Sequence, residues 1–429
     1  MLDVQTQGLS RTPSPWNEKD NLFEEEILGK NPVVEGTEFV YKRSKIVELN
    51  PKGISIAAQH IYTKLHTESY TPRTWRTHPL HILPEDSYSP SEPWNKAVLN
   101  WIFLISSLNF SFWSEKEGTS ERYGVEWQTS WDSKETKVWT GYWSLVAALD
   151  RALQENIPIT DPNFYSSEIL CPDSLIEYIF RAAGQSTETI PLLRERIAIM
   201  REVGFILCHS YGGSFQGFLD EFHRRHAGEG TALDLVKMVT ETFPSFRDEF
   251  FFEGRKVCIW KRAQILVAET WAAFYPDPST STTAGALKHP LFPGKRGPAI
   301  HELTMFADYR VPQILHHLQI LTYPASLVQT LGAGTLLESG SREELSLRAA
   351  SVVAVERVRE EMFRLMVHEQ EKGPGDTAGD GQSGNEVSSV LIDFFLWDLA
   401  KRVENGEEKI EGIETSEIIP AHRTRSIWY

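Results

Sequence analysis

Apolar residues recur every three to four positions along most of the chain, which is the spacing of one buried face of an α-helix. The clearest run consists of Trp94, Val98, Trp101, Ile102, Ile105 and Leu108. The same spacing predicts helices over residues 197–208, 232–243 and 261–273. Ser341 followed by Glu344 forms a capping box, which opens a long helix that continues through Leu365. The pattern therefore predicts a mainly α-helical protein.

One segment departs from the helical pattern. Between Tyr123 and Tyr142, the residue types Trp, Thr, Val and Tyr recur at alternating positions, which predicts a short β-hairpin. Strands and helices do not alternate along the chain, so a doubly wound α/β sheet is not expected. No internal repeat is visible. We predict one large helical domain with a small β-hairpin excursion.

Composition separates this domain from three polar segments. Residues 1–35 are polar and acidic and are predicted to form a disordered leader. Residues 276–298 are dense in Pro, Gly, Ser and Thr, and residues 372–388 are rich in glycine. Both compositions are typical of surface insertions. We expect these two insertions to belong to a single domain that spans residues 36–429.

The net charge of −16 constrains the partner. A protein that grips a nucleic-acid backbone normally carries a basic face, because neutralising phosphates supplies most of the affinity. The sequence contains no dense stretch of Lys and Arg. A long nucleic acid is therefore not an expected partner, whereas a single small phosphate could still be held by a few local cations.

The cysteines point to a reducing compartment. Cys171, Cys208 and Cys258 are widely spaced and form no CxxC or Cys/His metal motif. No apolar run approaches the ~20 residues of a membrane span, and the N-terminus has no signal-peptide pattern. We expect a soluble monomer in the cytoplasm, with the nucleus as a second compartment, and no metal site.

The stretch LTMFADYRVPQ, residues 303–313, has the most informative local chemistry. It places Asp308 between two aromatic residues, next to Arg310 and shortly before Pro312. A helix N-cap would explain Asp308 without any function. The functional interpretation is a carboxylate that faces the anomeric carbon of a nucleoside and stabilises an oxocarbenium-like cation. The two interpretations are compatible, because a carboxylate at a helix start is held rigidly.

A second acidic segment runs from Ile392 to Asp398. Asp393 and Asp398 lie there among apolar and aromatic residues, and the simplest interpretation is two solvated faces of a helix. Five residues correspond to about 140° around an ideal helix, so both acids would not face one pocket. The functional interpretation is that both accept N–H donors of a base, with Phe394 as a stacking wall. This requires a helix that starts near Asp393, and we predict such a start.

Two further candidates are basic. Lys261 and Arg262 enter an apolar helix, where they either reach the surface and balance Glu269 or bind a 5′-phosphate. His81, in the segment His78-Pro79-Leu80-His81, is on spacing alone a loop histidine. Neither candidate is decided by local pattern.

Together these segments resemble the queuosine 5′-phosphate N-glycosylase family, a group of mainly α proteins whose fold is similar to that of DNA glycosylases. The matching segments, in order, are residues 98–101, 109–115, 140–145, 212–215, 243–248, 261–268, 303–313, 392–398 and 422–425. The resemblance implies hydrolysis of queuosine 5′-monophosphate. That reaction frees queuine, a 7-deazaguanine base salvaged for tRNA modification, and needs no metal or organic cofactor.

The resemblance also implies roles for individual residues. Asp308 matches the catalytic carboxylate of the family. The positions that match base-binding residues are His81, Phe306, Asp308, Asp393, Phe394 and Asp398. Queuine carries a secondary amine that is cationic at neutral pH, so several carboxylates around it are physically reasonable.

Three functions remain open at this point. The first is a nucleotide N-glycosidase, with queuosine 5′-monophosphate and queuine as its small-molecule partners. The second is a non-catalytic helical module that binds queuine-like bases, which would not need Asp308 beneath the sugar. The third is a nucleic-acid glycosylase that acts on a flipped base, against which the negative charge argues.

Overall fold

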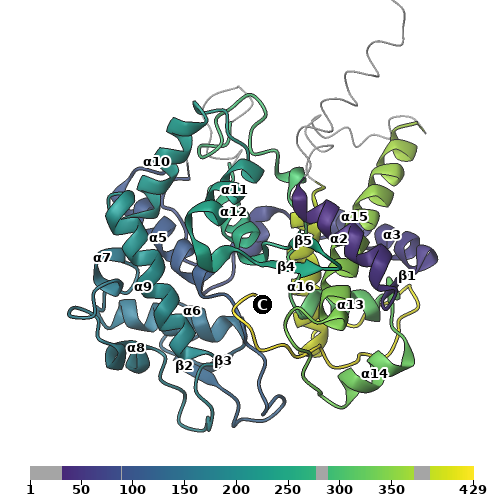
Figure 1. Ribbon diagram of the computed structural model, residues 1–429, viewed down its shortest axis with the longest axis horizontal. Helices are drawn as coiled ribbons and strands as arrows, with labels where there is room; N and C mark the ends of the chain where they lie inside the picture. Colours follow the sequence, from purple (N-terminus) through teal and green to yellow (C-terminus); the bar gives the residue numbers. More distant parts are fainter. Residues whose placement is uncertain (1–30, 88, 277–287, 372–386) are drawn as a thin grey trace, which may run out of the picture.

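Helices dominate the computed structural model, which describes residues 31–87, 89–276, 288–371 and 387–429 (Figure 1). The α-helices of these residues are α2 (Pro32–Ser44), α3 (Pro51–Thr67), α4 (Pro72–Arg76), α5 (Pro93–Ser107), α6 (Tyr142–Gln154), α7 (Pro162–Tyr165), α8 (Asp173–Ile179), α9 (Leu193–Ser210), α10 (Phe215–Arg225), α11 (Ala232–Thr242), α12 (Lys261–Ala273), α13 (Arg310–His317), α14 (Ala325–Gly332), α15 (Arg342–Glu371) and α16 (Ser389–Glu404). Two short 3₁₀ helices are η1 (Pro244–Phe246) and η2 (Ile300–Glu302). The mainly α prediction is confirmed.

The β structure consists of small antiparallel pairs. β2 (Gly124–Gln128) pairs with β3 (Thr136–Thr140), which confirms the predicted hairpin. The sequence pattern did not predict the other pairs. These are β4 (Glu249–Phe252) with β5 (Arg255–Cys258), and β1 (Glu48–Leu49) with β6 (Leu321–Thr322). Each strand of these pairs has at most four residues, too few for an alternating pattern to stand out.

Local signals fix several helix ends. The segment predicted to be helical from residue 261 to residue 273 coincides with α12. At the start of α15, the Ser341 hydroxyl accepts a hydrogen bond from the Glu344 amide at 3.3 Å. The Glu344 carboxylate in return accepts from the amide of Gly340 at 2.9 Å, one residue before the position that a capping box uses. The predicted cap is therefore present in a slightly shifted form.

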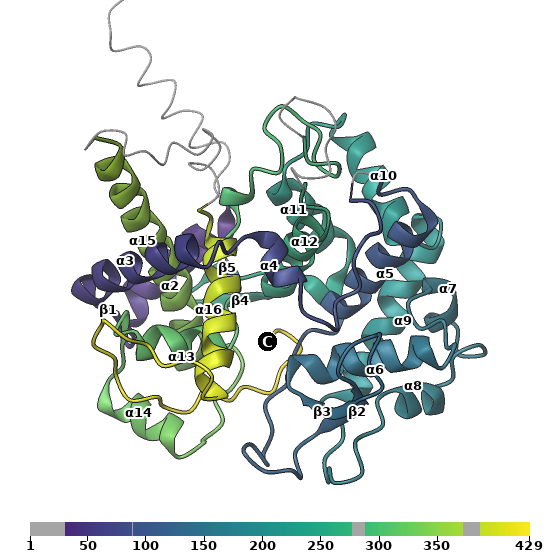
Figure 2. The same ribbon diagram turned by 180° about the vertical axis from the view of Figure 1, so that it is seen from behind.

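The helices form two groups with a central seam (Figures 1 and 2). One group contains α5 to α11, and the other contains α2, α3 and α13 to α16. α12 packs against α5, α11 and α4, while α16 packs against α13, α15 and α4. The short helix α4 therefore bridges α12 and α16. The C-terminal end of the chain also lies between the two groups.

Buried cations join elements across this seam. Arg262 of α12 donates to the carbonyl oxygen of Ser107, at the end of α5, and to that of Ser245 in η1. Arg348 of α15 forms a bidentate ion pair with Asp248, through Nη1 at 3.0 Å and Nη2 at 2.6 Å. Both arginines are almost fully buried. These contacts fix the start of α12 relative to both helix groups.

The polar segments lie mostly outside the described residues. This applies to residues 1–30 of the predicted leader, to residues 277–287 in the first half of one predicted insertion, and to residues 372–386 in nearly all of the other. Helical structure begins inside the range predicted for the leader, because α2 starts at Pro32 with Asn31 as its cap. Within the described part of the chain, no helix has the length and apolar character needed to cross a membrane.

Candidate active site

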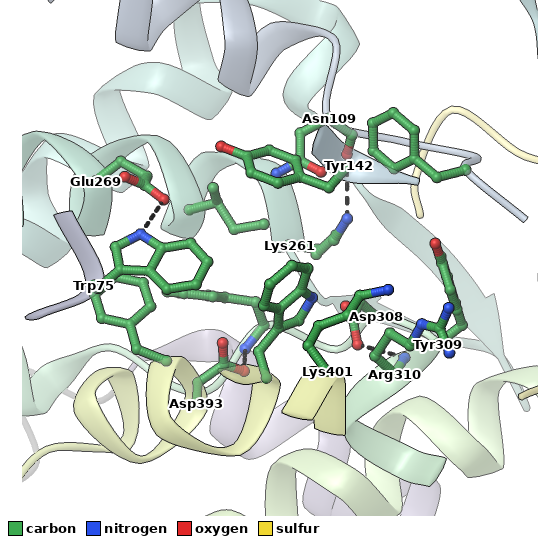
Figure 3. A pocket seen from close by; sticks show the side chains of 15 residues that line it. Trp75, Asn109, Tyr142, Lys261, Glu269, Asp308, Tyr309, Arg310, Asp393 and Lys401 are labelled. Atoms are coloured by element: carbon green, nitrogen blue, oxygen red, sulfur yellow. Dashed lines mark hydrogen bonds between the residues drawn. The ribbon is translucent and has the colours of Figure 1, made fainter. Parts of the chain in front are cut away.

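A pocket lies where the two helix groups meet (Figure 3). Its lining comes from α4, α6, α12, α16, the segment after α5, and the turn that leads into α13. The empty space amounts to about 620 Å³, including the part that is open to solvent. The lining residues are Trp75, Asn109, Phe112, Tyr142, Lys261, Ile265, Glu269, Phe306, Asp308, Tyr309, Arg310, Asp393, Phe394, Trp397 and Lys401.

Asp308 lies near the middle of the pocket and is fixed by the start of α13. Its Oδ1 atom accepts hydrogen bonds from the amides of Arg310 at 2.8 Å and Val311 at 2.9 Å. Asp308 therefore caps the helix, as the sequence predicts, and also lines the pocket. Burial raises the pKa of Asp308, while Lys261 and the two amides oppose this rise. Because both amides bond to Oδ1, Oδ2 is the oxygen that can face a ligand.

Lys261 is the first residue of α12 and is buried in the pocket wall. Its Nζ atom donates to the carbonyl oxygen of Asn109 at 3.1 Å (Figure 3). Burial lowers the pKa of Lys261 to about 8, and Asp308 is the largest influence in the opposite direction. Lys261 therefore remains mainly protonated at neutral pH.

Asp393 supplies a second carboxyl group from α16. Its Oδ1 atom accepts a hydrogen bond from the amide of Phe306 at 2.9 Å. Burial, followed by the nearby charge of Asp308, raises the pKa of Asp393 well above its ordinary value. One pocket thus contains two carboxyl groups in different environments. Asp308 lies beside a lysine and two helix amides, whereas Asp393 lies in an apolar wall.

Aromatic rings and a further acid surround one end of the pocket. The Phe394 ring stacks on Trp75 with centroids 5.0 Å apart and an angle of 5°, and the Phe306 ring lies 6.0 Å from Phe394. Glu269 accepts hydrogen bonds from Trp75 Nε1 and Arg76 Nη1, each at 2.7 Å. These contacts hold Trp75 in a fixed orientation, so this end offers flat surfaces together with acceptor oxygens.

The opposite end of the pocket is cationic. Figure 3 shows Arg310 on the far side of Asp308 from Trp75 and Glu269, with Lys401 rising from α16 in front of Asp308. Arg310 forms an ion pair with Glu404 at 2.8 Å, and Lys401 pairs with the same glutamate at 2.7 Å. The pocket is therefore ordered from an aromatic and acidic end, past Asp308, to a cationic end.

Asp398 is not among the pocket residues. It accepts a hydrogen bond from the Tyr70 hydroxyl at 2.5 Å, and burial raises its pKa to about 6. α16 begins at Ser389 with Ser388 as its cap, directly after the predicted insertion and four residues before Asp393, so the helix start is found but Asp393 is not in its first turn. Asp393 therefore lies in the second turn of a regular helix. The angular separation expected for an ideal helix sends the two acids in different directions.

His81 and Arg262 also lie outside the lining. His81 is buried between the rings of Trp75 and Trp101, with centroid distances of 5.7 and 6.0 Å, and burial lowers its pKa. It contacts the pocket wall through Trp75. Arg262 directs both of its Nη atoms to backbone carbonyls. The ligand contacts expected for these two residues stay predictions.

Comparison with known proteins identifies the family of this chain. The model of the queuosine salvage protein family matches residues 88–429. The chain belongs to this family. Family members named queuosine 5′-phosphate N-glycosylase/hydrolase include one from Schizosaccharomyces pombe, which is 37% identical over 402 residues, covering 92% of this chain and 99% of the relative. The Mus musculus relative of that name is 34% identical, covering 92% and 98% of the two chains, and the Sphaerobacter thermophilus relative is 33% identical, covering 78% and 82%.

Several residues of the pocket were not singled out from the sequence. Trp397 and Lys401 follow Asp393 at intervals of four residues on α16, and Ile265 and Glu269 follow Lys261 in the same way on α12. This spacing places each set on one helix face, so it could have identified them. Trp75, Asn109 and Tyr142 come from separate elements. No local spacing connects them to the other pocket residues.

Proposed function

We propose that this protein hydrolyses the N-glycosidic bond of queuosine 5′-monophosphate and releases queuine. One observation carries the proposal: Asp308 lies between an aromatic, acidic end and a cationic end of a single pocket. A nucleoside monophosphate has the same order of base, sugar and phosphate. Relatives that cover nearly the whole chain are named for action on queuosine 5′-phosphate.

The proposed substrate pose follows that order. The flat base lies against Phe306 and Phe394 and hydrogen-bonds to Asp393 and Glu269, whose oxygens suit N–H donors and a cationic amine. The sugar then lies over Asp308. The negative net charge of the chain favours a free mononucleotide over a polynucleotide.

In the proposed reaction the C1′–N bond breaks and its electron pair goes to the base nitrogen. Positive charge develops on the sugar, and the Asp308 carboxylate stabilises it from a fixed position set by the two amides of α13. A water molecule adds to C1′ and loses a proton, while the base gains one. The rigid cap keeps the carboxylate in place, so little reorganisation is needed as the charge forms.

We assign the 5′-phosphate to Arg310 and Lys401. Both line the cationic end, and both are balanced by Glu404, which a phosphate would replace as their partner. The sequence suggested Lys261 or Arg262 for this role. Arg262 has its Nη atoms committed to Ser107 and Ser245. We expect Lys401→Met to lower kcat/KM for queuosine 5′-monophosphate more than for dephosphorylated queuosine, because only the first substrate loses a contact.

The decisive experiment is incubation of the purified protein with queuosine 5′-monophosphate, followed by mass detection of free queuine. Release by the parent, and release about a hundredfold slower or less by Asp308→Asn, supports the proposal. Queuine binding without any release from the nucleotide would instead indicate a binding module. Release from an oligonucleotide but not from the mononucleotide would indicate a nucleic-acid glycosylase.

A further inference from the structure

We infer that Lys261 is a positioning residue that acts through Asp308. From across the pocket, Lys261 keeps the Asp308 carboxylate ionised. Lys261 is not a ligand of the phosphate. The inference deepens the proposed function and rests on it. Lys261 and Asp308 line the same pocket, while the cationic end lies with Arg310 and Lys401.

Lys261 is anchored at both ends. Its Nζ atom donates to the Asn109 carbonyl at 3.1 Å, and its backbone amide donates to Oδ2 of Asp248 at 3.2 Å. The side chain is almost fully buried. A long, buried side chain with both ends bonded has lost the rotamer freedom that a lysine needs to follow a mobile phosphate.

The same carboxylate of Asp248 also connects to Asp308. Arg348 pairs with Asp248, and the Arg348 Nε atom donates to the carbonyl oxygen of Ala307 at 3.1 Å. Ala307 directly precedes Asp308. One buried ion pair, Asp248–Arg348, therefore fixes the backbone of the lysine and the backbone next to the aspartate. Their relative position is set by α12, α15 and the turn before α13 together.

The two charges act mainly on each other. Asp308 is the strongest charge that favours protonated Lys261, and Lys261 is the strongest influence that favours ionised Asp308. The other charged groups facing Lys261 are Arg262, Arg348, Asp248 and Asp393, and Arg310 of α13 also favours the ionised form of Asp308. Because the pKa of Lys261 is about 8, the lysine carries its charge at acidic and neutral pH. Asp393 acts in the opposite direction, since a second carboxylate in the pocket would disfavour ionisation of the first.

The sign of the pH effect follows from this pairing. Removing the lysine charge raises the pKa of Asp308. Because activity needs the ionised form of Asp308, the variant loses activity at a higher pH than the parent when the solution is acidified. For each unit by which the pKa of Asp308 rises, kcat/KM on the acidic limb of the pH profile falls about tenfold. At high pH Asp308 ionises without help, so the defect of Lys261→Met should shrink as the pH rises. A lost phosphate contact would not show this recovery.

The test measures kcat/KM for queuine release against pH, with queuosine 5′-monophosphate and with dephosphorylated queuosine. The variants are Lys261→Met, Lys261→Arg and the matched control Lys401→Met. We expect Lys261→Met to impair both substrates by the same factor, to move the acidic limb to higher pH, and to recover at high pH. Lys261→Arg keeps the charge and should stay close to the parent. Lys401→Met should impair only the phosphorylated substrate.

A double variant adds an independent criterion. Because Lys261 acts through Asp308, Asp308→Asn with Lys261→Met should be no slower than Asp308→Asn alone. A Lys261→Met defect confined to the phosphorylated substrate would overturn the inference in favour of a phosphate ligand. A defect that is equal at every pH and accompanied by lost queuine binding would indicate a purely structural role.

Failure of the proposed function would appear differently. In that case the parent protein releases no queuine at any pH. The pairing can then be read directly from the pKa of Asp308, by ¹³C NMR titration of labelled aspartate in the parent and in Lys261→Met. A higher Asp308 pKa in the variant supports the pairing, and an unchanged pKa overturns it.

Discussion

Asp308 and Asp393 face the same pocket, and burial raises the pKa of both carboxyl groups. At Asp308, Lys261 and two helix amides oppose this rise, whereas at Asp393 the nearby charge of Asp308 adds to it. A pair of carboxyl groups with separated pKa values is a common arrangement in catalytic sites. The difference arises from partners and burial, since the residue type is the same.

The first prediction concerns Asp308. Asp308→Asn removes the charge that stabilises the glycosyl cation but retains an oxygen that can accept from the amides of Arg310 and Val311. We expect the rate of queuine release to fall about a hundredfold or more, with the fold and the affinity for queuine preserved. Single-turnover assays and calorimetry with queuine measure the two effects. Near-normal turnover would leave Asp308 as a helix cap only.

A second prediction separates the two acids of α16. Asp393 lines the pocket and Asp398 contacts Tyr70, so their alanine variants should differ. We expect Asp393→Ala to weaken queuine binding by ~1–3 kcal/mol, because a base donor and the Phe306 amide lose their acceptor. Asp398→Ala should change the affinity much less. Calorimetry on both variants tests this, and equal losses would show that Asp398 also reaches the base.

At the scale of elements, α12 and α16 each present a row of pocket residues at four-residue intervals. A regular helix brings such residues to one face, while Asp398, five residues after Asp393, falls outside the row. α4 completes the site from between these helices, through Trp75 and its contact with Glu269. The pocket therefore depends on three helices that keep a fixed relative position.

Arg262 tests this dependence. Its Nη atoms bond to the carbonyls of Ser107 and Ser245, which ties α12 to α5 and η1. Arg262→Gln leaves these buried carbonyls without their charged donor and should lower the free energy of unfolding by roughly 2–5 kcal/mol. Chemical denaturation gives this value. The ratio of kcat/KM between the phosphorylated and dephosphorylated substrates should not change, and a selective loss on the phosphorylated substrate would instead make Arg262 a phosphate ligand.

At the scale of the whole molecule, the pocket forms where two groups of helices meet, and the Asp248–Arg348 ion pair is buried. The pair contacts the start of α12 and the residue before Asp308. Its position explains why segments far apart in the sequence contribute to one site. Stability and activity are thus linked through the same buried contacts.

The fourth prediction concerns this pair. Arg348→Met leaves Asp248 buried without its partner and should destabilise the protein by about 3–5 kcal/mol. Combining it with Asp248→Asn should cost less than the sum of the single variants, because the second change removes the stranded charge. Denaturation of the two single variants and the double variant measures this coupling. Strict additivity would mean that the two residues act independently.

The sequence by itself determined the features that depend on neighbouring residues. Helical periodicity predicted α12 and the capping of α15, alternation predicted the β2–β3 hairpin, and the residue types around Asp308 predicted a helix cap. These depend on backbone geometry over a few residues, so a local pattern suffices. The family motifs likewise identified the pocket residues Asp308, Phe306, Asp393 and Phe394.

Only the tertiary structure decided how distant groups meet. Arg262 is bonded to a carbonyl 155 residues away, and Asn109, which receives the Lys261 hydrogen bond, lies 152 residues from it. Lys261 and Arg262 are neighbours with the same charge, yet one lines the pocket and the other does not. Adjacent residues point about 100° apart on a helix, and what each one meets depends on the packing of other helices. That packing involves long-range contacts, which no local spacing records.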